Sequence, residues 1–332
     1  MKKLKLISFL ILFMVLNSIV KAQEIYPGKA SKLEKDIAAQ FPFESKFIDL
    51  GAEKIHYVES GEGDPIILLH GLPSSSYLWR NVIPVIDGNK KVFALDFLGF
   101  GKSSFPKDRN VSVEVQYKML TDFIEAKKLK NVTLFMQDIG SLVGMLYVIR
   151  QPENVKGVVL FEAPFMPAEY FYKQLPFTMK AFTKLTSKPQ RAERWLVKKN
   201  FAGKNLAVNF FTGRKLSKEI KENYKKPWDD KERRYALTNG PDPGSLPKEK
   251  GKGNSEFEQL LNTIADGMKK TEKPILFFYA KRGLVNKKEA VKYARENFKN
   301  YSEVYLGKGK HFLTESHPVK MGEEFNKWFE KL

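Results

Sequence analysis

An aspartate between two apolar segments constrains the fold of this chain more than any other feature. Residues 132–136 (VTLFM) are β-branched, aromatic and apolar, as is typical of a buried strand. Residues 142–149 (LVGMLYVI) have the small and apolar side chains of a buried helix. Asp138 therefore lies on a turn between a central strand and a helix, and Gly140 lets that turn be tight. Such a turn can raise a nucleophile above the edge of a sheet, but an aspartate there can also cap the helix.

Strands and helices alternate through most of the chain, which predicts a mostly parallel sheet with helices on both faces. The alternation stops between residues 164 and 253, which are helical in period, basic and interrupted by proline and glycine. We therefore expect a core of residues 41–163 and 254–332, with residues 164–253 inserted as a helical cap. Strands are predicted at residues 46–50, 54–58, 66–69, 91–95, 132–136, 155–161, 274–279 and 302–306, and helices at about 78–85, 111–128, 142–149, 287–298 and at the C-terminus.

The N-terminus has the pattern of a secretory signal peptide. Three lysines precede an apolar run over residues 6–16, and Ala22 ends a small-residue cleavage site. The run is shorter than the roughly 20 apolar residues that span a bilayer. We expect cleavage of residues 1–22, followed by a polar lead-in over residues 23–40. The mature protein would begin at Gln23, would be periplasmic or secreted, and would have no stable membrane anchor.

The charge and the cysteine content exclude several kinds of site and partner. The formal net charge is +19, and the chain contains no cysteine. The lack of cysteine excludes disulfides, a thiolate nucleophile and cysteine metal sites, and we expect no metal and no cofactor. The basic residues are scattered and no nucleic-acid motif accompanies them, so we expect a solvated basic surface and no nucleic acid; an anionic membrane surface is the alternative. Residues 96–103 imitate a phosphate loop, but Asp96 stands where that motif requires glycine.

One of the four histidines stands where a general base is needed. His311 follows the last predicted strand, and the carboxyl ends of parallel strands face the ligand crevice. The order of nucleophile before base also fits a hydrolase triad. A histidine base needs a carboxylate to fix its tautomer and stabilise its cation. The loop after residues 274–279 has no acid, whereas Glu162 begins the loop after residues 155–161, so Glu162 is the expected acid. Its alternative role is a charge that closes an apolar strand.

Several segments together resemble one enzyme family. They are FPF at 41–43, HYV at 56–58, HGLPSSSYLWRNVIP at 70–84, DFLGFGKSS at 96–104, QDIGS at 137–141, FEAP at 161–164, YKKPW at 224–228 and KHFLTE at 310–315. From about residue 41 to the end, the sequence resembles the haloalkane dehalogenases of the α/β-hydrolase fold. The resemblance implies Asp138 as nucleophile, His311 as base and Glu162 as acid, in the subgroup whose acid follows the strand after the nucleophile. It also implies that the backbone N–H groups of Leu72 and Ile139 hold the oxyanion.

The chain departs from this family where the leaving halide is held. The family usually uses two side-chain N–H donors, a tryptophan directly after the nucleophile and often an asparagine after His-Gly. Here these positions are Ile139 and Leu72, whose side chains donate nothing. Removal of one preorganised donor typically costs roughly a hundred- to a thousandfold in rate. Candidate replacements in the cap, each of which can instead be apolar packing, are Trp195, Tyr170, Tyr172, Tyr224 and Trp228.

These features predict a haloalkane dehalogenase-like hydrolase that forms a covalent alkyl ester on Asp138 and releases it with water activated by His311. Its partners would be a small apolar organic substrate and water, with the protein a monomer or a weak oligomer. An epoxide hydrolase with the same triad is the alternative, and it would need cap tyrosines to protonate the opening oxygen. A ligand-binding protein on a hydrolase scaffold is a third possibility, against which the intact triad weighs.

Overall fold

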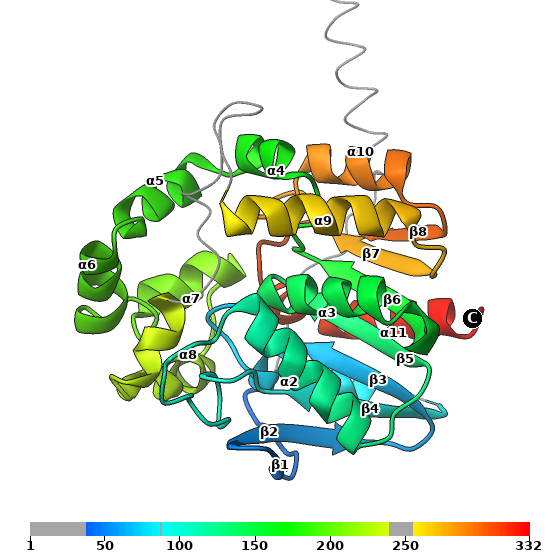
Figure 1. Ribbon diagram of the computed structural model, residues 1–332, viewed down its shortest axis with the longest axis horizontal. Coiled ribbons are helices and arrows are strands. Elements are labelled where there is room, and N and C mark those ends of the chain that lie inside the picture. Colours follow the sequence, from blue (N-terminus) through cyan, green and yellow to red (C-terminus); the bar gives the residue numbers. More distant parts are fainter. Residues whose placement is uncertain (1–37, 87, 239–254) are drawn as a thin grey trace, which may run out of the picture.

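The computed structural model describes residues 38–86, 88–238 and 255–332, and an eight-stranded sheet forms its centre (Figure 1). The strand order is β1-β2-β4-β3-β5-β6-β7-β8. β2 pairs antiparallel with β1 and β4, and every other neighbouring pair is parallel. The strands are β1 (Lys46–Leu50), β2 (Glu53–Ser60), β3 (Asp64–Leu69), β4 (Lys90–Leu95), β5 (Val132–Gln137), β6 (Val155–Phe161), β7 (Ile275–Tyr279) and β8 (Tyr301–Tyr305). The mostly parallel α/β sheet expected from the alternating pattern is confirmed.

Alternation along the central strands builds two apolar layers. In β3, Ile67 and Leu69 pack in the layer that contains the helices α2, α3, α9 and α10, whereas Ile66 and Leu68 pack in the layer with Trp79 and α11. Figure 1 shows α2, α3 and α9 in front of the sheet and α11 behind it. These helices are α2 (Val113–Ala126), α3 (Ile139–Arg150), α9 (Glu256–Lys270), α10 (Lys288–Asn297) and α11 (Pro318–Phe329). Short 3₁₀ turns lie at η3 (Pro152–Asn154) and η8 (Leu313–Glu315).

A run of short helices separates β6 from α9 and forms the cap. Figure 1 shows α5 to α8 beside the sheet, where they project away from α2 and α3. The cap elements are α4 (Ala168–Gln174), α5 (Phe177–Thr186), α6 (Pro189–Ala192), the π-helical η4 (Glu193–Lys198), α7 (Asn205–Thr212), α8 (Lys218–Lys225) and the 3₁₀ helices η5 (Lys226–Asp229) and η6 (Arg233–Thr238). The end of the predicted cap, residues 239–253, lies outside the described residues.

A hydrogen bond from the cap to a buried ion pair of the core joins the two parts. Both guanidinium N–H₂ groups of Arg80 donate to Glu315, at 2.6 and 2.9 Å, and neither side chain is exposed. The hydroxyl of Tyr224, on α8, donates to the same carboxylate at 2.5 Å. Since Glu315 lies four residues after His311, the contact fixes α8 relative to the histidine loop.

One predicted element differs from the structure. The helix expected near residues 78–85 is instead two 3₁₀ turns, η1 (Ser76–Trp79) and η2 (Ile83–Val85). Pro84 lacks the N–H that a continuous helix requires, and the Ser76 N–H donates to the Asp96 carboxylate at 2.6 Å.

The structure does not test the predicted export signal. The predicted signal peptide and most of the lead-in, through residue 37, lie outside the described residues. Within the part of the chain that is described, no helix combines the length and apolar character needed to cross a bilayer.

Candidate active site

Asp138 lies at a strained turn between β5 and α3. Its φ of 53° is in the left-handed region, which turns the side chain away from the helix. A Cβ on Gly140 would lie 2.5 Å from the carbonyl oxygens of Leu69 and His70, so only glycine lets the turn approach β3. The Asp138 carboxylate makes no capping hydrogen bond to α3 and retains 25% of its exposure. The capping alternative is therefore wrong, and the carboxylate is presented to the cavity.

A loop after β3 holds one oxygen of this carboxylate. The Leu72 N–H donates to Asp138 Oδ1 at 3.0 Å. Gly71 is required here because a Cβ would lie 2.3 Å from the Asp138 Cβ. Buried His70 braces the loop: its Nδ1 lies 3.0 Å from the Gly71 carbonyl oxygen, and its Nε2 accepts from the Phe97 N–H at 3.1 Å. The backbone donor expected at Leu72 therefore points at the carboxylate.

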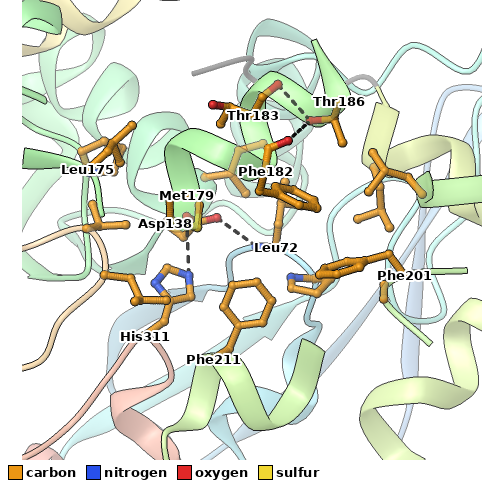
Figure 2. Close-up of a pocket in the computed structure, with 18 of the residues that line it drawn as sticks. Leu72, Asp138, Leu175, Met179, Phe182, Thr183, Thr186, Phe201, Phe211 and His311 are labelled. Atoms are coloured by element: carbon orange, nitrogen blue, oxygen red, sulfur yellow. Dashed lines mark hydrogen bonds and ion pairs between the residues drawn. The ribbon is translucent and has the colours of Figure 1, made fainter. Parts of the chain in front are cut away.

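His311 lies between the two carboxylates. Its Nε2 is 3.5 Å from Asp138 Oδ2, and its Nδ1 is 3.1 Å from Glu162 Oε2 (Figure 2 shows the first contact). Burial lowers the pKa of His311, but the hydrogen bond to Glu162 and the charges of Asp138 and Glu162 outweigh burial and raise the pKa above its usual value. The backbone N–H of His311 donates to the Phe211 carbonyl oxygen at 2.9 Å, so the cap also fixes the loop that bears this imidazole.

Glu162 is buried at the end of β6 and is held by backbone donors. Strands β5 and β6 are in register to their ends, so the next residues, Asp138 and Glu162, lie side by side. Glu162 Oε2 accepts from the N–H groups of Leu284 and Val285 at 2.8 and 2.9 Å, and Oε1 accepts from the Asn286 N–H at 3.2 Å. These donors keep the carboxylate oriented toward His311 Nδ1.

The sequence reasoning missed Gln137, the residue before Asp138. Its side chain is fully buried, and its amide nitrogen lies 2.7 Å from His311 Nε2. With Nδ1–H directed at Glu162, Nε2 of neutral His311 is an acceptor, so the amide donates to it. Gln137 Oε1 is buried with no hydrogen-bond partner among the described residues. Rotation of the amide would present this oxygen to Nε2–H once the imidazolium forms. The available signal in the sequence was a glutamine at the end of a strand expected to be buried, because a buried amide needs hydrogen-bond partners.

The Asp138 carboxylate and the His311 imidazole open onto an apolar cavity of about 220 Å³ under the cap. Figure 2 shows Met179 next to Asp138, Phe182 and Phe201 on the right-hand side of the same space, and Phe211 beside His311. The lining residues are Leu72, Pro73, Asp138, Ile139, Leu142, Pro164, Phe171, Leu175, Met179, Phe182, Thr183, Thr186, Ala192, Leu196, Phe201, Ala202, Phe211, Leu237, Thr238, Phe257, Leu284, Val285 and His311. Such a lining favours a small apolar ligand.

Three threonines are the remaining polar side chains in this lining. The hydroxyls of Thr183, Thr186 and Thr238 donate to backbone carbonyl oxygens within their own helices, at 3.0, 3.0 and 2.7 Å. They therefore present oxygen lone pairs to the cavity. In the lining that the structure describes, no side chain directs an N–H or O–H toward an anion released at Asp138, because the Nδ1–H of neutral His311 is directed at Glu162 and its Nε2 is an acceptor.

None of the five proposed leaving-group residues is part of the described lining of the cavity. Tyr224 donates to Glu315, and Trp228 is buried with its ring edge-on to Phe100. The Trp195 ring lies under the Lys199 ammonium. Tyr172 lies under Lys180, and Tyr170 is largely exposed. The helical period indicates which aromatic residues of the cap are at least partly buried. It does not indicate which helix or strand each of them packs against, because that depends on the tertiary fold.

The fold and the site define a class of protein. A family model described as the alpha/beta hydrolase fold matches residues 64–318, and the chain belongs to that family. Within that family the chain is dehalogenase-like, because it is similar in sequence and in fold to haloalkane dehalogenases, as the sequence resemblance indicated.

Proteins of two activities match along most of the chain. A haloalkane dehalogenase of Agrobacterium fabrum is 28% identical over 279 residues, which cover 84% of this chain and 89% of the relative. The crystal structure of the haloalkane dehalogenase DatA from Agrobacterium tumefaciens C58 matches with a TM-score of 0.78 and 26% identity over 87% of this chain and 96% of that one. A cis-3-alkyl-4-alkyloxetan-2-one decarboxylase of Shewanella oneidensis is 25% identical over 311 residues, 84% of this chain and 91% of the relative.

Proposed function

We propose that Asp138 displaces a halide from a saturated carbon and forms an alkyl ester, which water then hydrolyses. The observation that carries this is the placement of one carboxylate at the floor of an apolar cavity, with one oxygen held by the Leu72 N–H and the other facing His311 Nε2. A carboxylate suits displacement at a saturated carbon because the product ester is stable, whereas attack on an ester would give a reactive anhydride.

In the first step an Asp138 oxygen forms a bond to the substrate carbon, and the halide leaves with the bonding electrons. Apolar walls exclude water from the nucleophile and so increase its reactivity. No proton is transferred, so His311 is not needed as a base. Positioning of the carboxylate by the Leu72 N–H is the main contribution of the protein to this step.

In the second step His311 Nε2 accepts a proton from water, and the oxygen attacks the Asp138 carboxyl carbon. The Leu72 N–H, with the Ile139 N–H, stabilises the oxyanion of the tetrahedral intermediate. Collapse of the intermediate releases the alcohol and restores the carboxylate, and His311 loses its proton. Glu162 stabilises the imidazolium that exists between these events. The balance is R–X plus water to R–OH, a proton and X⁻.

The leaving group is the point at which this site differs from the group. Neither Leu72 nor Ile139 offers a side-chain N–H, and the threonine hydroxyls are directed at backbone oxygens. Halides that need little stabilisation, such as bromide and iodide, should therefore leave faster than chloride by a wider margin than in enzymes with two donors.

A strained cyclic ester is a second candidate substrate. Its leaving group would be a carboxylate tethered to the substrate, which does not depend on a halide site. Two observations favour it: the missing donors at Leu72 and Ile139, and the relative that decarboxylates oxetan-2-ones. An epoxide is less well supported, because the cavity lining that the structure describes contains no tyrosine to protonate the opening oxygen.

A substrate screen tests these proposals. Bromoalkanes, epoxides and oxetan-2-ones are supplied separately, and halide release, diol formation and carbon dioxide release are each assayed. The proposal predicts halide release that Asp138→Ala abolishes. Carbon dioxide release without halide release would replace it with the lactone reaction, and ligand binding without turnover of any class would leave a binding protein.

We also propose that the protein is exported, with Gln23 as its mature N-terminus. The basic start, the short apolar run over residues 6–16 and Ala22 support this. Mass spectrometry of the protein from its native host should show the loss of residues 1–22, and an intact N-terminus would contradict it.

A further inference from the structure

A second hollow, of about 840 Å³, lies at the surface where the cap meets the core. The segment from α4 into α5 forms one side, and the loop from β7 to the start of α10 forms the other. Figure 1 shows α4 and α10 next to each other at the end of the molecule opposite β1 and β2. Leu175 and Leu284 line both this hollow and the active-site cavity, so one wall of side chains separates the two.

Positive charge surrounds this hollow. Its lining contains one acidic residue, Glu289, and five basic residues, which we term the basic rim: Lys173, Lys281, Arg282, Lys287 and Lys288. Lys173 is paired with Glu169, and Lys288 lies 3.8 Å from Glu289. Among the described residues, no acidic side chain pairs with the other three members of the rim. The rim therefore has an excess of positive charge that an anionic surface would neutralise.

Exposed aromatic side chains lie within the same rim. Phe177 is 84% exposed and Tyr170 is 56% exposed, the two highest values for large hydrophobic residues in the described part of the chain. Both line the hollow. Exposure of an aromatic side chain to water is unfavourable unless a membrane or a partner buries its apolar surface. Basic residues around projecting aromatic rings are the pattern of proteins that bind the interface of a bilayer.

The geometry points to a peripheral membrane-binding face: the basic rim, with Phe177 and Tyr170 inside it, binds the surface of a bilayer that contains anionic phospholipid. The cations lie near the lipid phosphates and the two rings lie among the headgroups. This orientation places the wall formed by Leu175 and Leu284 against the lipid, next to a cavity suited to apolar substrates. The inference does not depend on the reaction at Asp138, because vesicle binding is measured without turnover.

Vesicle flotation tests this inference. The full chain is mixed with vesicles of phosphatidylcholine containing phosphatidylglycerol, or of phosphatidylcholine alone. We expect binding to the anionic vesicles that weakens with salt. Each cation near an anionic surface contributes about fivefold to binding, so Lys281→Glu with Arg282→Glu should weaken it by about twentyfold or more. Phe177→Ser should weaken it by about tenfold, including at high salt, where the cations contribute less.

A matched control removes the general effect of charge. Lys54→Glu with Lys118→Glu makes the same change of net charge on exposed residues of β2 and α2, away from the hollow. All variants contain the same N-terminus, so any lipid affinity of the predicted signal peptide is equal in every comparison. Circular dichroism verifies that each variant is folded. Retained binding in this control, with loss in the other two variants, supports the face. Equal loss in the control, absence of binding to anionic vesicles, or binding to DNA but not to vesicles would overturn it.

Discussion

Replacement of Glu162 by glutamine is a sharp test of how the site divides its two steps. The carboxylate accepts four N–H groups, three from the backbone of residues 284–286 and one from His311 Nδ1. A glutamine has one acceptor oxygen and one N–H₂ group. With its oxygen directed at Leu284, Val285 and His311, the N–H₂ group faces the Asn286 N–H, so one buried donor loses its partner.

The expected magnitude follows from the lost charge. A hydrogen bond to a charged group contributes about 1.5–3 kcal/mol, which corresponds to roughly ten- to 150-fold in rate when it stabilises the imidazolium. Hydrolysis of the ester should therefore fall about a hundredfold in Glu162→Gln. Formation of the ester should change much less, because His311 accepts no proton in that step.

Rapid mixing with a bromoalkane separates the two steps. The bromide burst should grow as hydrolysis of the ester becomes limiting, so Glu162→Gln should release about one equivalent of bromide quickly and then turn over slowly, with a larger burst than the wild type. Intact-protein mass should show the ester during the slow phase. Glu272→Gln, an exposed glutamate far from the site, is the matched control. An equal loss in both steps would refute the assignment of Glu162 to the imidazolium.

Three further predictions concern other residues of the site. Leu72→Asn with Ile139→Trp should raise bromide release by tenfold or more through added N–H donors, less any cost of overpacking, and should not affect epoxide opening; no gain in the folded variant would contradict the leaving-group argument. Hydrolysis of the ester should fall as the pH drops through the pKa of His311. Esterification removes the Asp138 charge that raises this pKa, so the pKa in the pH profile of ester hydrolysis should be lower than the pKa of His311 measured by NMR in the free enzyme. Equal pKa values in the two measurements would count against the geometry. Gln137→Leu should slow hydrolysis by about tenfold and leave ester formation unchanged in the same rapid-mixing assay; equal effects on both would show a structural role only.

The sheet and the meeting of Asp138, Glu162 and His311 were accessible from the sequence because each depends on a local pattern. Asp138 and Glu162 each follow a continuous apolar strand, and neighbouring parallel strands end at the same edge. His311 follows the last strand, and this position, together with the order of nucleophile before base, selected it as the expected base from four histidines. The structure then brings the three side chains together over separations of 24 to 173 residues, as the sheet order requires.

The supports of the triad could not be predicted in the same way. The donors to Glu162 are backbone N–H groups of a loop whose side chains gave no sign of that contact. The Phe211 carbonyl oxygen that holds the His311 loop belongs to the cap, and helical period does not show where a cap helix docks. For the same reason Tyr224 could be identified as a half-polar cap residue but not as the partner of buried Glu315.

The most direct test of the account is the mass of His311→Phe after incubation with a bromoalkane that the wild type converts. The first step needs only Asp138, and the second needs the base. The account predicts a mass increase of one alkyl group that persists after removal of substrate and that Asp138→Ala with His311→Phe abolishes. An unchanged mass in folded His311→Phe would contradict the claim that Asp138 is a nucleophile whose ester His311 clears.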